Sequence, residues 1–230
     1  MKHIKQIFFD LDHTLWDFER NSSETLSELF EEFKLATHID NKERFLATYQ
    51  TVNGQYWKKY RDGKIDKQTV RFGRFAATLN RFNIPDAENL GRNIGDKYVE
   101  RGPHKKNLFP DTHETLAYLK NKYPLHIITN GFKEVQSIKM SGADLNQYFD
   151  VILCSEDVGV NKPHRKVFER ALELTNCKAE HALMIGDNLE ADILGAQKLG
   201  ITTVLFDPKK EHQTEKSLIV HNLKDLQAIL

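Results

Sequence analysis

The feature that most restricts the fold is the alternation of short apolar segments with amphipathic segments in the C-terminal part of the chain. In the amphipathic segments, apolar residues recur at helical spacing over 112–120, 133–140, 166–174 and 191–199. The apolar segments of strand length are Leu125 to Thr129, Val151 to Cys154, Ala182 to Gly186 and Thr202 to Phe206. Strands and helices that alternate in this way predict a parallel sheet with helices on both faces, which is a Rossmann-like, doubly wound α/β core.

The N-terminal part of the chain has a different pattern. From about residue 22 to about residue 98, apolar residues recur every three or four positions, which predicts a block of helices. The segment IKQIFF in front of this block has the composition of one more strand. We therefore predict that the helices are inserted after the first strand of the sheet. The core then comprises residues 1–16 and 104–230, and the helical insertion comprises residues 17–103.

Charge and cysteine content argue against several classes of function. The chain has 33 basic and 33 acidic residues and a formal net charge of zero, so no global field draws it to nucleic acid or to an anionic membrane. Its apolar runs are shorter than the roughly 20 residues that a membrane-spanning helix needs. The N-terminal sequence MKHIKQIFFD has no signal-peptide pattern, and the two cysteines have no CxxC spacing. We expect a cytoplasmic globular protein without disulfides.

Polar residues that could bind a ligand or take part in catalysis directly follow the predicted strands. Ligands of a doubly wound sheet bind beyond the carboxyl ends of its strands, so these positions are where a site is expected. The residues found there, in chain order, are Asp10 and Asp12, then Thr129, Asn130 and Gly131, then Lys162, and finally Asp187, Asn188 and Asp192. We expect these carboxylates, the hydroxyl and the ammonium to converge at one edge of the sheet.

The chemistry of this set favours phosphoryl transfer. Carboxylates gathered at one edge repel each other unless a hard cation lies among them, and Asp oxygens suit Mg²⁺ rather than zinc. A lysine and a hydroxyl are donors to phosphate oxygens. One aspartate can attack phosphorus to give an aspartyl-phosphate, and a second carboxyl two residues further on can protonate the leaving alkoxide and then activate water.

Each of these motifs also has an ordinary structural explanation. A DxD pair after a strand is more often a solvated turn than a site, Thr129 can cap a strand end, and GDNxxxD can be a helix N-cap with favourable acidic residues. The order of the signals favours the functional interpretation, because they stand at four successive strand ends and each has the required chemical type.

With these motifs the chain resembles the haloacid dehalogenase superfamily of phosphotransferases. DLDHTL is similar to the first motif of that superfamily, Thr129 in ITNG to the second, Lys162 in NKP to the third, and GDNLEAD to the fourth. The helices inserted after the first motif resemble its α-helical caps. DLDHTLWDF together with ITNGF further resembles the pyrimidine nucleotide 5′-phosphatases of the YjjG and YfnB type.

The resemblance implies a nucleophile and a metal site. Asp10 would be the nucleophile and a Mg²⁺ ligand. Asp12 would be the general acid and base, and its backbone carbonyl would also bind the metal. Asp187 would complete the metal site.

The resemblance also implies a phosphate site. Thr129 and the backbone N–H groups of Asn130 and Gly131 would hold the phosphoryl group, and Lys162 would neutralise charge on the nucleophile and the phosphate. Asp192 would orient that lysine or the waters of the metal, and Asn188 would lie in the same outer layer. The substrate would be a small phosphorylated metabolite, namely a nucleoside monophosphate, with no nucleic-acid or membrane partner, and the enzyme would be a monomer or homodimer.

Several alternatives stay open at this point. A haloacid dehalogenase would share the fold, but it needs neither the second aspartate at position 12 nor Mg²⁺. A phosphatase of another metabolite such as a sugar phosphate, or a phosphosugar mutase, would use the same core. A non-enzymatic phospho-accepting or binding module would bind or become phosphorylated without turnover.

Overall fold

The computed structural model describes residues 1, 3–213 and 216–230, and these divide into two compact units. The core unit comprises Met1–Phe18 and Lys106–Leu230, and the helical unit comprises Glu19–Lys105. Both boundaries lie two residues beyond those predicted from the sequence. The side chain of Phe18 explains the first difference, because it packs against the hydrophobic cluster of the core unit.

The core unit is built on a parallel sheet, as predicted. Its strands lie in the order β3-β2-β1-β4-β5-β6, and each neighbouring pair is parallel. The bounds are β1 (Gln6–Phe9), β2 (Leu125–Thr129), β3 (Val151–Cys154), β4 (Ala182–Gly186), β5 (Thr202–Phe206) and β6 (Leu218–Val220). The predicted strands from β2 to β5 are confirmed, whereas the short edge strand β6 was not predicted because three residues give too brief a pattern.

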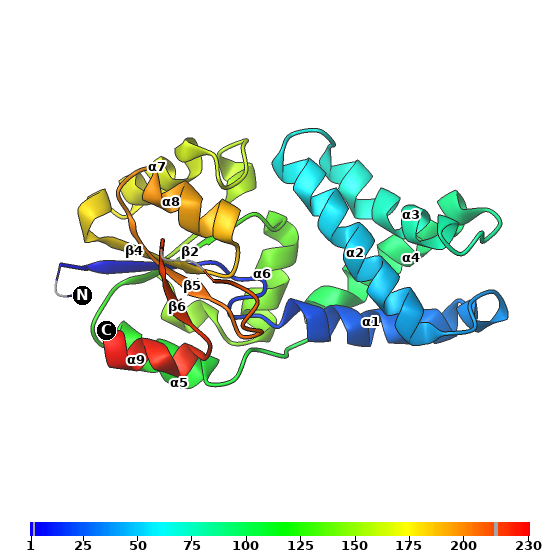
Figure 1. Cartoon of the computed structure of the whole chain (residues 1–230), viewed down its shortest axis with the longest axis horizontal. Coiled ribbons are helices and arrows are strands. Elements are labelled where there is room, and N and C mark those ends of the chain that lie inside the picture. The colour runs from blue at the N-terminus through cyan, green and yellow to red at the C-terminus, as the bar shows by residue number, and fades with distance from the viewer. Residues whose placement is uncertain (2, 214–215) are drawn as a thin grey trace. The chain divides into compact units, whose positions relative to one another are not determined.

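Helices cover both faces of this sheet, with α7 and α8 on one face and α5 and α9 on the other (Figure 1). The helices are α5 (Thr112–Lys120), α6 (Lys133–Gly142), α7 (Arg165–Leu174), α8 (Gly195–Gln197) and α9 (Leu226–Ile229). Single 3-10 turns lie at Asn146–Tyr148, Ser155–Asp157, Ala179–His181 and Leu223–Asp225. The helix predicted over 191–199 is different in the structure: a π-helix, Leu189–Leu194, precedes the short α8. The wider π turn carries Asp192, whose carboxylate reaches back to the N–H of Asn188.

Alternating strand residues supply the two layers of the core. Ile7 and Phe9 belong to one hydrophobic cluster, and Phe8 between them belongs to the other. The same division separates Ile127 from Ile128 on β2. Successive side chains of a strand point to opposite faces, so a strand that is apolar on both faces must be covered twice. This explains why the strands read as continuous apolar runs.

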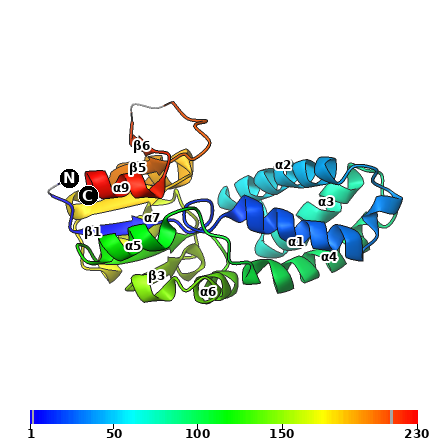
Figure 2. The ribbon, with the colours of Figure 1, turned by 90° about the horizontal axis from the view of Figure 1, so that it is seen from below.

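The helical unit has its own apolar core, and Figure 2 shows its helices packed as a bundle. Leu29 of α1, Tyr49 of α2, Phe75 of α3 and Ile94 of α4 all belong to that core. The helices are α1 (Phe18–Glu32), α2 (Lys42–Arg61), α3 (Arg74–Asn80) and α4 (Ala87–Arg101), with 3-10 turns at Leu35–Thr37 and Gly102–His104 and a π-helix at Thr69–Gly73.

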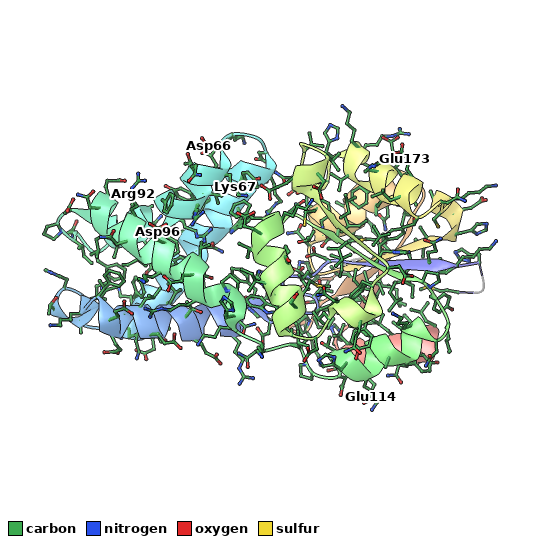
Figure 3. The ribbon with its side chains drawn as sticks, turned by 180° about the vertical axis from the view of Figure 1, so that it is seen from behind. Asp66, Lys67, Arg92, Asp96, Glu114 and Glu173 are labelled. Atoms are coloured by element: carbon green, nitrogen blue, oxygen red, sulfur yellow. The ribbon has the colours of Figure 1, made fainter. Side chains whose placement is uncertain are left out.

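Helix α4 shows how the sequence sets the orientation of these helices. Ile94 and Tyr98 are buried four residues apart, whereas Arg92 and Asp96 are exposed and lie on the outer side of the same helix (Figure 3). This spacing is that of an amphipathic helix. Across the described part of the chain, none of the helices has the length and apolarity needed to cross a membrane.

A close contact between α3 and α4 generates a stability prediction. A Cβ atom at Gly91 would lie 2.5 Å from Ala76 N and 2.7 Å from Ala76 Cα, and these backbone atoms can move only if α3 moves. We expect Gly91→Ala to lower the free energy of unfolding by about 1–3 kcal/mol through overpacking. Urea denaturation followed by circular dichroism measures this change.

Gly54→Ala is the matched control, because Gly54 is exposed in the middle of α2 and a Cβ there meets nothing within 4 Å. We expect it to raise the free energy of unfolding by about 0.5–1 kcal/mol, since alanine restricts the unfolded chain more than glycine does. Equal stability of Gly91→Ala and the wild type would contradict the packing argument.

Candidate active site

The predicted site residues meet because the strands that precede them are neighbours. β1 lies between β2 and β4, so the carboxyl ends of these three strands are adjacent. Asp10 follows β1, Thr129 ends β2, and Asp187 follows β4. The N–H of Asp10 donates to the carbonyl of Ile185 at 2.9 Å, so a backbone hydrogen bond to β4 anchors the first site residue.

The ammonium of Lys162 lies at the centre of the site. Its Nζ is 2.8 Å from Asp10 Oδ1 and 2.7 Å from Asp192 Oδ1, and it donates to the carbonyl of Ile128 at 2.6 Å. Lys162 is only 1% exposed. Burial lowers the pKa of this amine, but the charges of Asp10 and Asp192 outweigh it, so the pKa of Lys162 is raised above 10.5. The lysine is therefore a permanent cation.

Asn130 holds the segment that carries this lysine. Its Nδ2 donates to the carbonyl of Lys162 at 3.0 Å, and its Oδ1 accepts the N–H of Lys162 at 2.8 Å. One amide side chain thus pairs with both backbone groups of Lys162 and ties that segment to the end of β2. The side chain of Asn130 has a positioning role that the sequence argument, which used only its N–H group, did not predict.

Three carboxylates surround the lysine. Oxygen atoms of Asp10, Asp187 and Asp192 all lie within 4.8 Å of one another. Burial and, next, the charge of Asp192 raise the pKa of Asp187 to about 8, although Thr14 Oγ1 donates to its Oδ1 at 3.2 Å. Burial also raises the pKa of Asp10 well above 3.8, since the attraction of Lys162 does not offset burial and the charges of Asp192 and Asp187.

This charge imbalance fits a hard divalent cation. Three carboxylates and one ammonium leave two negative charges in excess when all the acids are ionised. The donors are carboxylate oxygens, which Mg²⁺ prefers. The raised pKa values of Asp10 and Asp187 have the direction expected for this excess of negative charge. Among the described residues, Asp10, Asp187 and Asp192 could therefore hold the ion.

Asp12 is held in a separate environment. Its Oδ1 is 2.5 Å from Lys139 Nζ, and its Oδ2 accepts from Gln136 Nε2 at 2.8 Å. Burial acts to raise the pKa of Asp12, but the charge of Lys139 and the hydrogen bonds from Lys139 and Gln136 outweigh it, so the pKa lies below 3.8. The side chain of Asp12 is thus paired outside the cluster of Asp10, Asp187 and Asp192.

The remaining predicted residues have identified local partners. Thr129 Oγ1 accepts from the N–H of Gly131 at 3.1 Å. Asn188 Oδ1 accepts from the N–H of Ala191 at 2.8 Å and caps the π-helix, while the N–H of Asn188 donates to Asp192 Oδ2. Asn188 therefore holds the turn that carries Asp192.

Sequence reasoning missed Lys139, Gln136 and Thr14. The signal for the first two was present, because Gln136 and Lys139 stand three residues apart within the predicted helix 133–140 and therefore share one face. Both are buried despite being polar, and a helix pattern gives no reason to expect that.

The chain was compared with known proteins. The model of the haloacid dehalogenase-like hydrolase family matches residues 7–206. YfnB, a HAD-hydrolase of Bacillus subtilis, is 28% identical over all of this chain and 95% of its own length. Its magnesium-bound crystal structure, described as revealing interdomain movement, has a TM-score of 0.89 at 29% identity and covers 99% of this chain and 98% of that one.

Two further relatives are similar over nearly their whole length. Pyrimidine 5′-nucleotidase YjjG of Escherichia coli is 29% identical over 97% of this chain and 96% of its own. Ribulose-1,5-bisphosphate 5-phosphatase of Halopiger xanaduensis is 30% identical over 92% of this chain and 88% of its own. Because the family match spans most of the chain, the protein belongs to the haloacid dehalogenase-like hydrolase family. It is an enzyme of the hydrolase class.

The raised pKa of Asp187 generates a pH prediction for the metal-free protein. As pH rises from 3.8 to about 8, the unfolded chain releases the proton of this carboxyl before the folded chain does, so the folded state loses stability. We expect Asp187→Asn to be more thermally stable than the wild type in EDTA at about pH 8.5, with a smaller difference at about pH 5. Differential scanning calorimetry at both pH values tests this. Added Mg²⁺ should then raise the melting temperature of the wild type more than that of Asp187→Asn.

Asp207→Asn is the control, because its effect on thermal stability should have the opposite sign to that of Asp187→Asn. Asp207 is buried, but its carboxylate accepts the N–H groups of Glu211 and His212, which outweigh burial and lower its pKa below 3.8. This group stabilises the fold above its unfolded pKa, and that contribution is lost as pH falls through the folded pKa. Asp207→Asn should therefore be less stable than the wild type at about pH 8.5. If Asp187→Asn also lost stability at high pH, the argument from excess negative charge would be wrong.

Proposed function

We propose that the protein is a Mg²⁺-dependent phosphomonoester hydrolase that forms an aspartyl-phosphate on Asp10 and acts on pyrimidine nucleoside 5′-monophosphates. The observation that carries the proposal is the buried contact of Lys162 with Asp10 and Asp192 beside Asp187. A carboxylate nucleophile, a fixed cation and an excess of negative charge that needs a metal ion are the elements of phosphoryl transfer.

In the first step, a carboxylate oxygen of Asp10 attacks phosphorus and the bond from phosphorus to the leaving oxygen breaks. Asp12 is ionised in the free protein, so it first takes the proton of the monoanionic phosphate group of the substrate. It then gives this proton to the leaving oxygen, so an alcohol leaves. Lys162 balances the charge that gathers on the nucleophile and on the phosphoryl oxygens. Thr129 and the backbone N–H groups of Asn130 and Gly131 hold the phosphoryl group. The hydrogen bond from the N–H of Gly131 to Thr129 Oγ1 must break when the phosphoryl group binds.

In the second step, water attacks the phosphorus of the aspartyl-phosphate. Asp12 takes a proton from that water, the bond from phosphorus to Asp10 breaks, and inorganic phosphate leaves. Mg²⁺, held by Asp10, Asp187 and the carbonyl of Asp12, would supply positive charge that stabilises the phosphoryl oxygens. Asp192 orients Lys162 through their ion pair.

The nucleotide substrate is supported by the similarity to the pyrimidine 5′-nucleotidase YjjG over nearly the full chain. The second candidate is a phosphatase of sugar phosphates, which the similarity to ribulose-1,5-bisphosphate 5-phosphatase favours. The carboxyl at position 12 argues against dehalogenation, since that reaction has no leaving alkoxide to protonate. We also propose that the helical unit is the cap of the enzyme. We expect the enzyme to be cytoplasmic, to be a monomer or homodimer, and to have no nucleic-acid or membrane partner.

A substrate panel tests this function. We expect phosphate release from UMP, dUMP and dTMP in the presence of Mg²⁺, with lower kcat/KM for purine monophosphates and sugar phosphates, and no release in EDTA. A preference for sugar phosphates would contradict the proposed nucleotide substrate but would still support the proposed phosphatase reaction. Isomerised product without free phosphate would identify a mutase, and no release from any substrate would remove the enzymatic proposal.

Asp10→Asn tests the nucleophile. We expect phosphate release to fall by more than about 1,000-fold, because the covalent route is lost when its nucleophile is removed. The melting temperature should not fall, since the change also removes one charge from the acidic cluster. Asp157→Asn, which alters an exposed carboxylate that pairs with Lys133, is the control and should keep full activity. Retained turnover in Asp10→Asn would remove the assignment.

A further inference from the structure

Two side chains of α6 hold the carboxylate of Asp12. Lys139 Nζ lies 2.5 Å from Asp12 Oδ1, and Gln136 Nε2 donates to Asp12 Oδ2 at 2.8 Å. Lys139 is 5% exposed and Gln136 is 1% exposed. The two residues stand three positions apart and share one face of the helix. Each oxygen of Asp12 thus has its own buried donor.

Gln136 also joins Asp12 to the end of β2. Its Nε2 donates to Thr129 Oγ1 at 2.7 Å, so the two hydrogens of one amide nitrogen reach Asp12 and Thr129. The amide can approach only because residue 131 is glycine: a Cβ atom there would lie 2.1 Å from Gln136 Nε2. Gln136 therefore fixes Asp12 relative to the hydroxyl that we propose to bind the phosphoryl group.

Two aromatic rings fix the other side of Lys139. Its Nζ lies 4.1 Å from the ring centroid of Trp16 and 5.6 Å from that of Phe18, distances at which the ring faces attract a cation. The backbone of Trp16 pairs with that of Asp12 in an isolated bridge. The ammonium is thus enclosed by the segment that also carries Asp12.

Stability alone is a weak reason for such an arrangement. A buried ion pair usually contributes no more to folding than apolar side chains of similar size, because both charges must leave water. What the arrangement does achieve is orientation, since two donors with different directions fix the plane of the Asp12 carboxyl. They also keep this carboxyl paired apart from Asp10, Asp187 and Asp192, which surround Lys162.

We propose that Lys139 and Gln136 are positioning residues for Asp12, which they hold beside Thr129 in the orientation required to pass a proton to the leaving oxygen and to take one from water. This inference rests on the proposed function. It adds two residues of α6 to the catalytic machinery, and they act through Asp12 rather than on the substrate.

Leaving groups of different basicity separate this role from a purely structural one. An alkyl phosphate such as UMP loses an alkoxide that needs a proton as the bond breaks, whereas para-nitrophenyl phosphate loses a stabilised phenolate that needs none. The ratio kcat/KM reports the steps up to departure of the leaving group. Loss of proton donation should therefore lower kcat/KM for the alkyl phosphate far more than for the aryl phosphate.

For Lys139→Met we expect kcat/KM with UMP to fall by about 100-fold and kcat/KM with para-nitrophenyl phosphate to fall by less than about tenfold. The attack of water on the aspartyl-phosphate should also slow, since it uses Asp12 as base. Stopped-flow mixing with para-nitrophenyl phosphate should then show a burst of nitrophenolate, larger than in the wild type, followed by slow turnover.

Three variants complete the test. Lys139→Arg keeps a cation and should restore most of the activity with both substrates. Lys133→Met removes an exposed lysine of the same helix, which pairs with Asp157, and should behave as the wild type. Gln136→Met should show the same dependence on the leaving group as Lys139→Met, and it replaces that variant if Lys139→Met does not fold.

The outcomes separate this inference from the function on which it rests. The decisive variant is a folded Lys139→Met, or Gln136→Met if Lys139→Met does not fold. Equal losses of kcat/KM on both substrates, or no loss on either, would overturn the positioning role. The contacts with Asp12 would then serve only to anchor α6. Failure of Lys139→Arg to restore activity would also count against it. A wild-type protein that releases phosphate from neither substrate would instead remove the proposed function.

Discussion

The arrangement of the site depends on one buried ammonium. Lys162 approaches within hydrogen-bond distance of Asp10, Asp192 and the carbonyl of Ile128, and without it the carboxylates would repel each other in a largely buried environment. The lysine reaches this place because Asn130 pairs with its backbone. The ends of β1 and β2 and the π turn after β4 are therefore held together by a single cation.

The two acidic residues of the first motif differ because of their neighbours. Asp10 is buried and shares Lys162 with Asp192, so its pKa is raised, whereas Asp12 accepts from both Lys139 and Gln136 and its pKa is lowered. Side chains two positions apart on one extended segment are thus directed into separate charge environments. This separation is what allows us to give them different roles, one as nucleophile and the other as proton carrier.

Much of the fold could be predicted because its signals are local. The segments that became β2 to β5 are continuous apolar runs, which a strand buried on both faces requires, and their predicted bounds were correct. The convergence of Asp10, Lys162, Asp187 and Asp192 followed from their positions after parallel strands. The π-helix at Leu189–Leu194 was not predicted, because its residues have an ordinary helical pattern. Its hydrogen bond to Asn188 and the ion pair of Asp192 with Lys162 cannot be seen in that pattern.

The sequence by itself determined the class of fold, the helical insertion and the chemical types at the strand ends, since each depends on residues that are close in the chain. Only the tertiary structure decided which charges pair with which. Lys139 lies 127 positions from Asp12 and Lys162 lies 152 positions from Asp10, so no pattern of spacing could join them. The physical reason is that an ion pair depends on distance in space and on exclusion of water, and both are fixed only when the sheet has formed and α6 has packed against it.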